Sequence, residues 1–295
     1  RFICSESLRY RLMARRSRPA YPRRRQVSPH AKSQEAATPS TLIVDATDGV
    51  LQMTINAPEA RNSLSAAGVI DGLVAALDQL ERDPELRCAV LTGAGGAFCS
   101  GGNLGELASM SEAQSRARMS INAWLYRRIA LCDKLIIAAV DGPAYGAGLG
   151  LATCCDWIIA GESAAFCSAF VRVGAMPDAG LFWSLPSRLG ASGARRMMLL
   201  GQEVRGAEAL AIGLADEFIA DGPALAAALV FARRMARGPT RAYGRIKAGL
   251  RQAPMTLEQA LQYQLDNGPG LFASDDFREG AQAFLEKRKP VFKGR

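Results

Sequence analysis

One acidic side chain stands in an otherwise apolar stretch of this sequence. The stretch FVRVGAMPDAGLFWSLP covers residues 170–186, and beyond Arg172 its one charged residue is Asp178. An ionised carboxylate loses much of its hydration on burial, so this aspartate either faces water or is kept in an apolar pocket to move a proton. From the residues alone, a turn after Pro177 is the commoner role for an aspartate at such a place.

Histidine chemistry is excluded from most of the chain. The single histidine is His30, so residues 41–295 contain no Ser-His-Asp triad, no Cys-His pair and no histidine-ligated metal site, and we predict no metal. Proton transfer must then use carboxylates, lysine, tyrosine or cysteine. Cys99 and Cys167 are interpreted as small packed hydrophobes, because no base or cation pattern accompanies them.

Two glycine-rich segments each follow an apolar run and precede a predicted helix. They are GAGGAFCSGGNL at residues 93–104 and DGPAYGAGLG at residues 141–150. Neither matches the phosphate-binding or dinucleotide-binding fingerprints. Two interpretations stay open: tight turns that need glycine, or loops whose backbone N–H groups bind developing negative charge at a helix start.

The elements that must position these segments alternate between strands and helices. Two strands flank an Asp48-Gly49 turn, and helical spacing covers residues 65–82 and 111–132. The runs RCAVLTGAG and KLIIAAVDG predict buried strands, and the pattern beyond residue 181 is almost wholly helical. This order predicts α/β layers followed by a helical C-terminal portion.

The net charge of +8 is confined to residues 1–40, which hold ten Lys and Arg against two acids, whereas the remainder holds 26 of each sign. We predict a disordered basic tail over 1–40, with a transit peptide or a non-native extension as alternatives, since the sequence starts at Arg1 and its first methionine is Met13.

Seven cysteines without a CxxC pair predict reduced thiols and a cytoplasmic location. No apolar run approaches the ~20 residues of a membrane span. We therefore expect no DNA and no membrane partner, and RNA only through the tail.

Four ordered motifs resemble the crotonase (enoyl-CoA hydratase/isomerase) superfamily. They are AFCSGGNLGEL, LIIAAVDGPAYGAGLGLATCCDWIIAG, MPDAGLFWSLPSRLG and FREGAQAFLEKRKPVF, and the resemblance covers residues 41–293. It implies an α/β spiral of ββα turns over 41–235 with a C-terminal helical trimerisation module over 236–295. It further implies a homotrimer or a dimer of trimers, an acyl-CoA thioester substrate, and no cofactor apart from the coenzyme A that the substrate carries.

The resemblance also implies roles for single residues. Carried over by position, the N–H groups of Gly102 and Ala147 form an oxyanion hole for a thioester enolate. The two glutamates of the family's hydratases align with Gly150 and Phe170, neither of which can carry a proton. Asp178 aligns with the aspartate of isomerase branches, which include ring-expanding isomerases of phenylacetyl-CoA breakdown.

Further positions are implied to bind substrate or coenzyme A. Arg61 and Lys287 would meet phosphates, Lys287 sometimes across a subunit boundary, and Tyr145 would shape the acyl pocket. A surface arginine, a solvated helix end and a core aromatic are the alternatives for these three. The complete set is Ala60, Arg61, Ser63, Ser100, Gly101, Asn103, Leu104, Tyr145, Phe170 and Lys287.

The sequence therefore predicts an enoyl-CoA isomerase of the single-aspartate branch. One carboxylate can remove a proton and return it two carbons along the same dienolate, without a second group or a water. The alternatives are a hydratase or lyase with a non-standard acid or base, and a catalytically silent homologue that binds coenzyme A or RNA.

Overall fold

The computed structural model describes residues 40–295, which group into one unit. The predicted basic tail lies outside the described residues, apart from Ser40. The strands are β1 (Leu42–Thr47), β2 (Val50–Ile55), β3 (Cys88–Gly93), β4 (Leu135–Val140), β5 (Pro143–Tyr145), β6 (Trp157–Gly161), β7 (Ala165–Cys167), β8 (Glu203–Arg205) and β9 (Glu217–Ile219).

The helices cover a larger share of the described residues than the strands do. They are α2 (Val69–Arg82), α3 (Leu104–Ala108), α4 (Glu112–Leu131), α5 (Ala147–Cys154), α6 (Leu181–Leu200), α7 (Gly206–Ala211), α8 (Ala224–Ala236), α9 (Thr240–Leu250), α10 (Leu257–Phe272) and α11 (Asp275–Leu285), with 3-10 turns η1 (Pro58–Ala60) and η2 (Ala169–Val173). None of these helices is long and apolar enough to cross a membrane.

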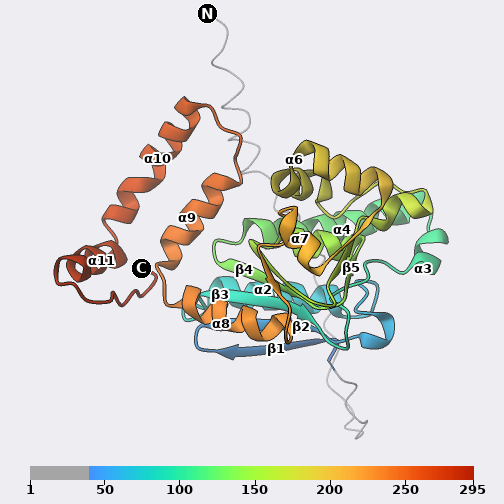
Figure 1. Cartoon of the computed structure of the whole chain (residues 1–295), viewed down its shortest axis with the longest axis horizontal. Helices are drawn as coiled ribbons and strands as arrows, with labels where there is room; N and C mark the ends of the chain where they lie inside the picture. Colours follow the sequence, from blue (N-terminus) through green and yellow to red (C-terminus); the bar gives the residue numbers. More distant parts are fainter. Residues whose placement is uncertain (1–39) are drawn as a thin grey trace, which may run out of the picture. The chain divides into compact units, whose positions relative to one another are not determined.

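The strands form two sheets (Figure 1). The larger has the order β1-β2-β3-β4-β6-β9 and is parallel except for the first pair, and the smaller has the order β5-β7-β8. Asp48 and Gly49 form the predicted two-residue turn, both with positive φ, and Thr47 pairs with Val50 across it. The predicted hairpin is confirmed.

Alternate residues of the larger sheet enter two separate cores. Cys88 and Val90 of β3 face the α8 side, where α8 presents an alanine every fourth residue between Ala224 and Ala236. Ala89 and Leu91 enter the main core with α2, α4 and α5. Both faces of a parallel strand are thereby covered, which explains why these strands are continuous apolar runs.

The carboxyl ends of β3 and β4 lie at the same edge of the sheet, because the two strands are parallel neighbours. The two glycine-rich segments leave the sheet at this edge, since they begin at Gly93 and Asp141. In parallel α/β sheets, ligands bind outside the carboxyl ends of the strands. The topology therefore brings both loops to the place where a site is expected.

The last three helices attach to the opposite end of β3. Arg87, directly before β3, donates hydrogen bonds to the carbonyls of Gly238 and Phe292, at 2.6 and 2.9 Å. Lys247 of α9 is buried and pairs with Asp156 at the end of α5. In α10 no residue is buried, although leucines recur along it. The predicted α/β class with a helical C-terminal region is confirmed. The almost wholly helical pattern expected beyond residue 181 is confirmed too, and only the short strands β8 and β9 interrupt it.

Candidate active site

The first glycine-rich loop is tied to the segment after β2 by reciprocal backbone bonds. The Ser100 N–H donates to the Arg61 carbonyl at 3.0 Å, and its hydroxyl donates to the Ala60 carbonyl at 3.3 Å. The Gly101 carbonyl accepts from the Leu64 N–H and the Ser63 hydroxyl, each at 2.8 Å. Five of the predicted binding residues, Ala60, Arg61, Ser63, Ser100 and Gly101, thus take part in these bonds through their backbones or hydroxyls.

Sequence reasoning missed Asn62, which fixes the same region. Asn62 is fully buried with a φ of 56°. Its side chain accepts from the Ala57 N–H at 2.9 Å and donates to the carbonyls of Ala94 and Ala97, at 2.8 and 2.6 Å. Asparagine is among the few non-glycine residues that tolerate the left-handed region, and that preference was the available signal.

Asn103 caps the short helix that follows the loop. Its side-chain oxygen accepts from the N–H groups of Gly105 and Glu106 at the start of α3. The cap gives Asn103 a role in the structure of the loop, and its predicted role in substrate binding stays a prediction. The next residue, Leu104, is exposed at the surface.

The second glycine-rich loop lies directly against the first. The Tyr145 N–H donates to the Cys99 carbonyl at 3.0 Å, and a Cβ built on Gly101 would lie 3.0 Å from the Ala147 nitrogen. Gly101 has a φ of 87°, and a Cβ on Gly148 would lie 2.0 Å from the Cys99 oxygen. Both positions therefore need glycine, because the two backbones approach too closely for a side chain.

The N–H groups of Gly102 and Ala147 donate no hydrogen bond to any part of the chain that the structure describes. Ala147 is the first residue of α5, where the backbone N–H has no partner within the helix. A helix start also carries partial positive charge. Two adjacent amide donors of this kind can hold an oxygen that becomes negative during a reaction.

Asp178 is partly buried, and its Oδ1 is buried without a hydrogen-bond partner among residues 40–295. Burial raises the pKa of its carboxyl above the usual range, and the Arg118 guanidinium offsets part of that rise. Burial raises the pKa of Tyr126 well above its ordinary value, and the charge of Asp178 contributes to that rise. The carboxyl therefore sits among protein atoms rather than in bulk water.

Close packing joins Asp178 to the second loop. A Cβ built on Gly150 would lie 2.5 Å from the Cβ of Ala179 and 2.4 Å from its oxygen. Gly150 lies one turn along α5 from Ala147, so the neighbour of Asp178 packs against the helix that supplies the amide donor. The same packing leaves no space for any side chain at position 150.

Phe170 and Tyr145 border the two loops in different ways. The Phe170 ring lies 3.8 Å from a Cβ built on Gly146, the residue before Ala147, and adds an apolar wall there. The Tyr145 hydroxyl donates to the Glu203 carboxylate, and burial together with this bond raises the pKa of Tyr145 to about 12. The Tyr145 hydroxyl is therefore bonded to a side chain of β8.

Of the two predicted phosphate-binding cations, Arg61 adjoins the first loop through its backbone and Lys287 does not. Arg61 is exposed, and its guanidinium has no partner in the described range 40–295. Lys287 follows α11, which packs on α10 and on the C-terminal residues that reach Arg87. That attachment is at the end of β3 away from the loops, so the chain does not bring its own Lys287 to the site. The role of Lys287 across a subunit boundary stays a prediction.

The sequence also missed two residues of α4 that border the site. Arg118 donates to the Ser65 hydroxyl at 2.6 Å and to Glu106 at 3.0 Å, and its guanidinium lies 3.8 Å from a Cβ built on Gly102. The Tyr126 hydroxyl donates to the Ala147 carbonyl at 3.1 Å. These two residues are eight apart, hence on one helix face, which was the signal in the sequence.

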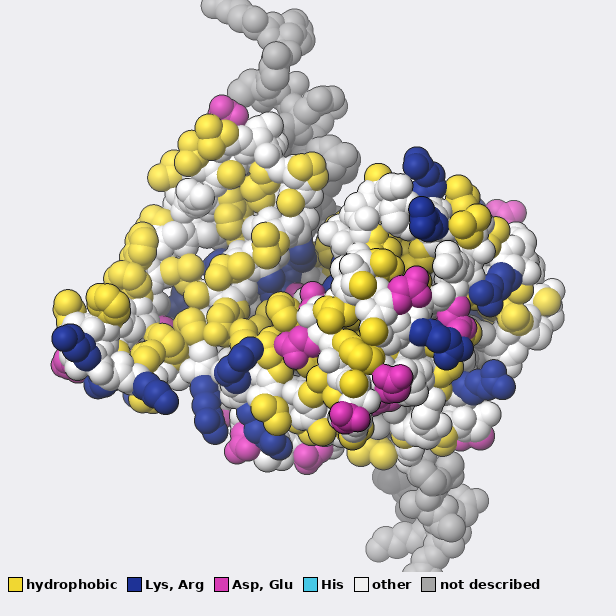
Figure 2. Space-filling view, in the orientation of Figure 1, with side chains coloured by type: hydrophobic (Ala, Val, Ile, Leu, Met, Phe, Trp, Pro, Cys, Tyr) yellow, Lys and Arg dark blue, Asp and Glu magenta, His cyan; other side chains and the backbone are white. Residues whose placement is uncertain are grey.

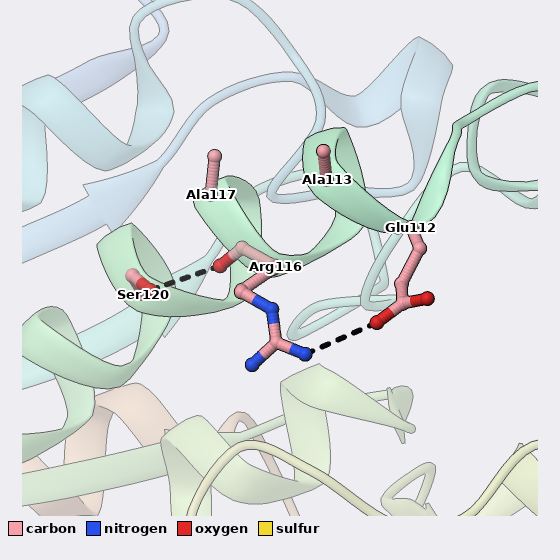
Figure 3. A pocket seen from close by; sticks show the side chains of 5 residues that line it. All are labelled: Glu112, Ala113, Arg116, Ala117 and Ser120. Carbon is pink, nitrogen blue, oxygen red and sulfur yellow. Dashed lines mark hydrogen bonds and ion pairs between the residues drawn. The ribbon is translucent and has the colours of Figure 1, made fainter.

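A wide hollow of about 590 Å³ lies elsewhere, on the outer face of α4 (Figure 3). Its lining residues are Glu112, Ala113, Arg116, Ala117 and Ser120. They project roughly opposite to Arg118 and Tyr126 around the helix, given about 100° per residue. This hollow is therefore separate from the two loops.

Comparison with known proteins agrees with this arrangement. The family model described as enoyl-CoA hydratase/isomerase matches residues 45–295. A probable enoyl-CoA hydratase of Rhodobacter capsulatus is 39% identical over 86% of this chain and 98% of its own length. The 1,2-epoxyphenylacetyl-CoA isomerase of Escherichia coli is 36% identical over 84% of this chain and 96% of its own length.

Solved structures show the same fold. The crystal structure of an enoyl-CoA hydratase from Bacillus anthracis superposes with a TM-score of 0.82 at 31% identity, and the match covers 86% of this chain and 100% of that one. Two amide donors at parallel-strand ends, one buried carboxyl beside them and these matches along almost the whole described chain lead to one conclusion. The chain belongs to the enoyl-CoA hydratase/isomerase family and has the crotonase fold.

Proposed function

We propose that this protein is an enoyl-CoA isomerase that moves a carbon-carbon double bond through a thioester dienolate. The N–H groups of Gly102 and Ala147 hold the thioester oxygen, and Asp178 removes the proton and returns it two carbons away. Exposed Arg61 meets coenzyme A phosphates, since its guanidinium is free to do so. No cofactor is needed beyond the coenzyme A of the substrate.

The observation that carries this proposal is the Asp178 carboxyl beside α5, whose Oδ1 is buried without a hydrogen-bond partner among residues 40–295. A buried carboxylate oxygen that accepts no hydrogen bond is well placed to take a carbon-bound proton, because a raised pKa brings its basicity closer to neutral pH. Water is disfavoured nearby, since Gly150 is packed against Ala179 and Phe170 contributes an apolar ring. Addition of water would need a group to orient it.

The proposal is tested by comparing two substrates of equal chain length. With trans-3-hexenoyl-CoA, we expect the 2-enoyl thioester to form. Its ultraviolet absorbance measures the rate of formation. With trans-2-hexenoyl-CoA, we expect hydration to be slower by about 10²-fold or more, because a missing acid or base typically costs 10²–10⁴ in rate. Hydration at a rate equal to or above isomerisation would instead support the second candidate, a hydratase, which the name of the Rhodobacter capsulatus relative favours.

We further propose that the protein works as a homotrimer or a dimer of trimers through its C-terminal helices. Leu257, Leu261 and Leu265 are spaced by four residues along α10 and are 68%, 49% and 68% exposed. Figure 2 shows hydrophobic side chains gathered along this helix. Such a stripe in a single chain supports burial against another subunit.

We expect Leu261→Lys combined with Leu265→Lys to lower the molar mass in solution from the oligomer to a single chain, because buried lysines lose hydration without partners. Light scattering after size exclusion measures the mass. Ile43→Lys on β1, also an exposed apolar position, is the control and should leave the mass unchanged. An unchanged mass in the double variant would contradict assembly through α10.

A further inference from the structure

A polar stripe on α4 runs between the two amide donors of the candidate site. Arg118, Asn122 and Tyr126 follow one another at intervals of four residues, so they share one helix face and are each about 6 Å apart along the axis. Arg118 lies next to Gly102, and Tyr126 is bonded to the carbonyl of Ala147. Asn122 therefore lies between the residues that border the two donors.

Asn122 differs from Arg118 and Tyr126 because its side-chain oxygen has no hydrogen-bond partner within residues 40–295. Arg118 bonds to Ser65 and Glu106, and Tyr126 bonds to Ala147. Asn122 is only 9% exposed, yet its Oδ1 is buried without a partner anywhere in residues 40–295. A buried amide oxygen left unpaired costs stability, so unpaired groups of this kind call for a missing partner.

The proposed base, Asp178, lies near the same stripe. Ala179 packs against Gly150 of α5, and the first residue of α5 accepts the bond from Tyr126. The charge of Asp178 contributes to the raised pKa of Tyr126, and the charge of Arg118 offsets part of the rise in the pKa of Asp178. The Oδ1 of Asp178 is also buried and unpaired. Two polar atoms without partners thus accompany one pair of amide donors.

We propose that Asn122 is a substrate-binding residue that selects acyl groups bearing a hydroxyl. A plain alkyl chain leaves the Asn122 oxygen unpaired, whereas a hydroxyl donates to it and can also accept from the amide nitrogen. A site built to bond a substrate hydroxyl discriminates strongly against the analogue that lacks it, because its own polar group then stays buried and unsatisfied. This inference rests on the proposed function, because it assumes that the ligand is an acyl-CoA.

The test measures binding of saturated thioesters, which cannot be isomerised. Calorimetry compares hexanoyl-CoA with analogues carrying a hydroxyl on C5 or C6. In the wild-type protein, we expect at least one hydroxylated analogue to bind at least tenfold more tightly than hexanoyl-CoA. In Asn122→Leu, which has a similar volume and no polar atoms, we expect this ratio to fall to about one while hexanoyl-CoA binds as well or better.

Ser120→Leu on the outer face of α4 is the matched control and should preserve the wild-type ratio. Equal binding of all three thioesters by the wild-type protein would overturn the inference, and this measurement needs no variant to fold. Retention of the preference in Asn122→Leu would overturn it as well. Failure of the proposed isomerase activity is detected separately with 3-hexenoyl-CoA, because the binding ratio does not depend on turnover.

Discussion

Asp178→Asn is expected to lower kcat for isomerisation of a 3-enoyl-CoA by about 10²–10⁴-fold, with a smaller change in KM. The amide matches the carboxyl in shape but cannot take a proton, and no second carboxylate is proposed to replace it. In wild-type protein, kcat should rise with pH through a pKa above the usual aspartate range, since only the ionised form is a base and burial raises its pKa. The pH profile of kcat and single-turnover absorbance measure both effects.

The same substitution should make the folded protein more stable near neutral pH, by ~1 kcal/mol. The folded-state pKa of Asp178 is raised, so the folded state binds the proton more tightly than the unfolded state does. Stability from this group is complete below the unfolded pKa and is lost as pH rises through the folded pKa. Urea unfolding at pH 7 and at pH 4 should show a larger gain in Asp178→Asn at the higher pH.

Asp221→Asn provides the matched control, because Asp221 is exposed in the loop before α8. It should change neither kcat nor stability beyond ~0.5 kcal/mol. Wild-type turnover in Asp178→Asn would remove Asp178 from the reaction and leave the proton transfer to another group.

Ala147→Pro is expected to lower kcat by about 10²–10³-fold, because it deletes one of the two proposed donors to the thioester oxygen. Proline is tolerated at the first position of a helix, where its missing N–H is not used. The preceding Gly146 has φ 53° and ψ −118°, the mirror image of the extended conformation that residues before proline prefer. An achiral glycine adopts either form, so the backbone should accept the ring.

Ala147→Gly keeps the N–H and serves as the control, with kcat expected within a few fold of the wild type. Circular dichroism and thermal unfolding check that Ala147→Pro retains the fold. A folded Ala147→Pro protein with wild-type kcat would show that the oxygen is held by other groups.

The family, the hairpin at Asp48-Gly49, the strand and helix order and the two glycine-rich loops could all be predicted from the sequence. These features depend on local residue types, since glycine marks close approach and apolar runs mark buried strands. Gly102, Ala147 and Asn103 were predicted from the resemblance of continuous motifs to the family, and their roles stay predictions.

Other features depend on residues that are far apart along the chain. Asn62 bonds across to Ala94 and Ala97, and Tyr126 of α4 bonds to Ala147. Local sequence patterns do not predict such bonds, because the partners come together only when distant segments pack. The hydrogen bond from the Tyr145 hydroxyl to Glu203 likewise could not be predicted from the sequence.

By itself, the sequence determined that residues 41–295 contain no histidine. It also determined that Asp178 is the one acid within its apolar stretch. Only the tertiary structure decided that this acid is partly buried against α5 and that the segment after Lys287 bonds to Arg87, at the other end of β3. The physical reason is that residue type limits what a side chain can do, whereas burial and proximity arise from packing between distant segments.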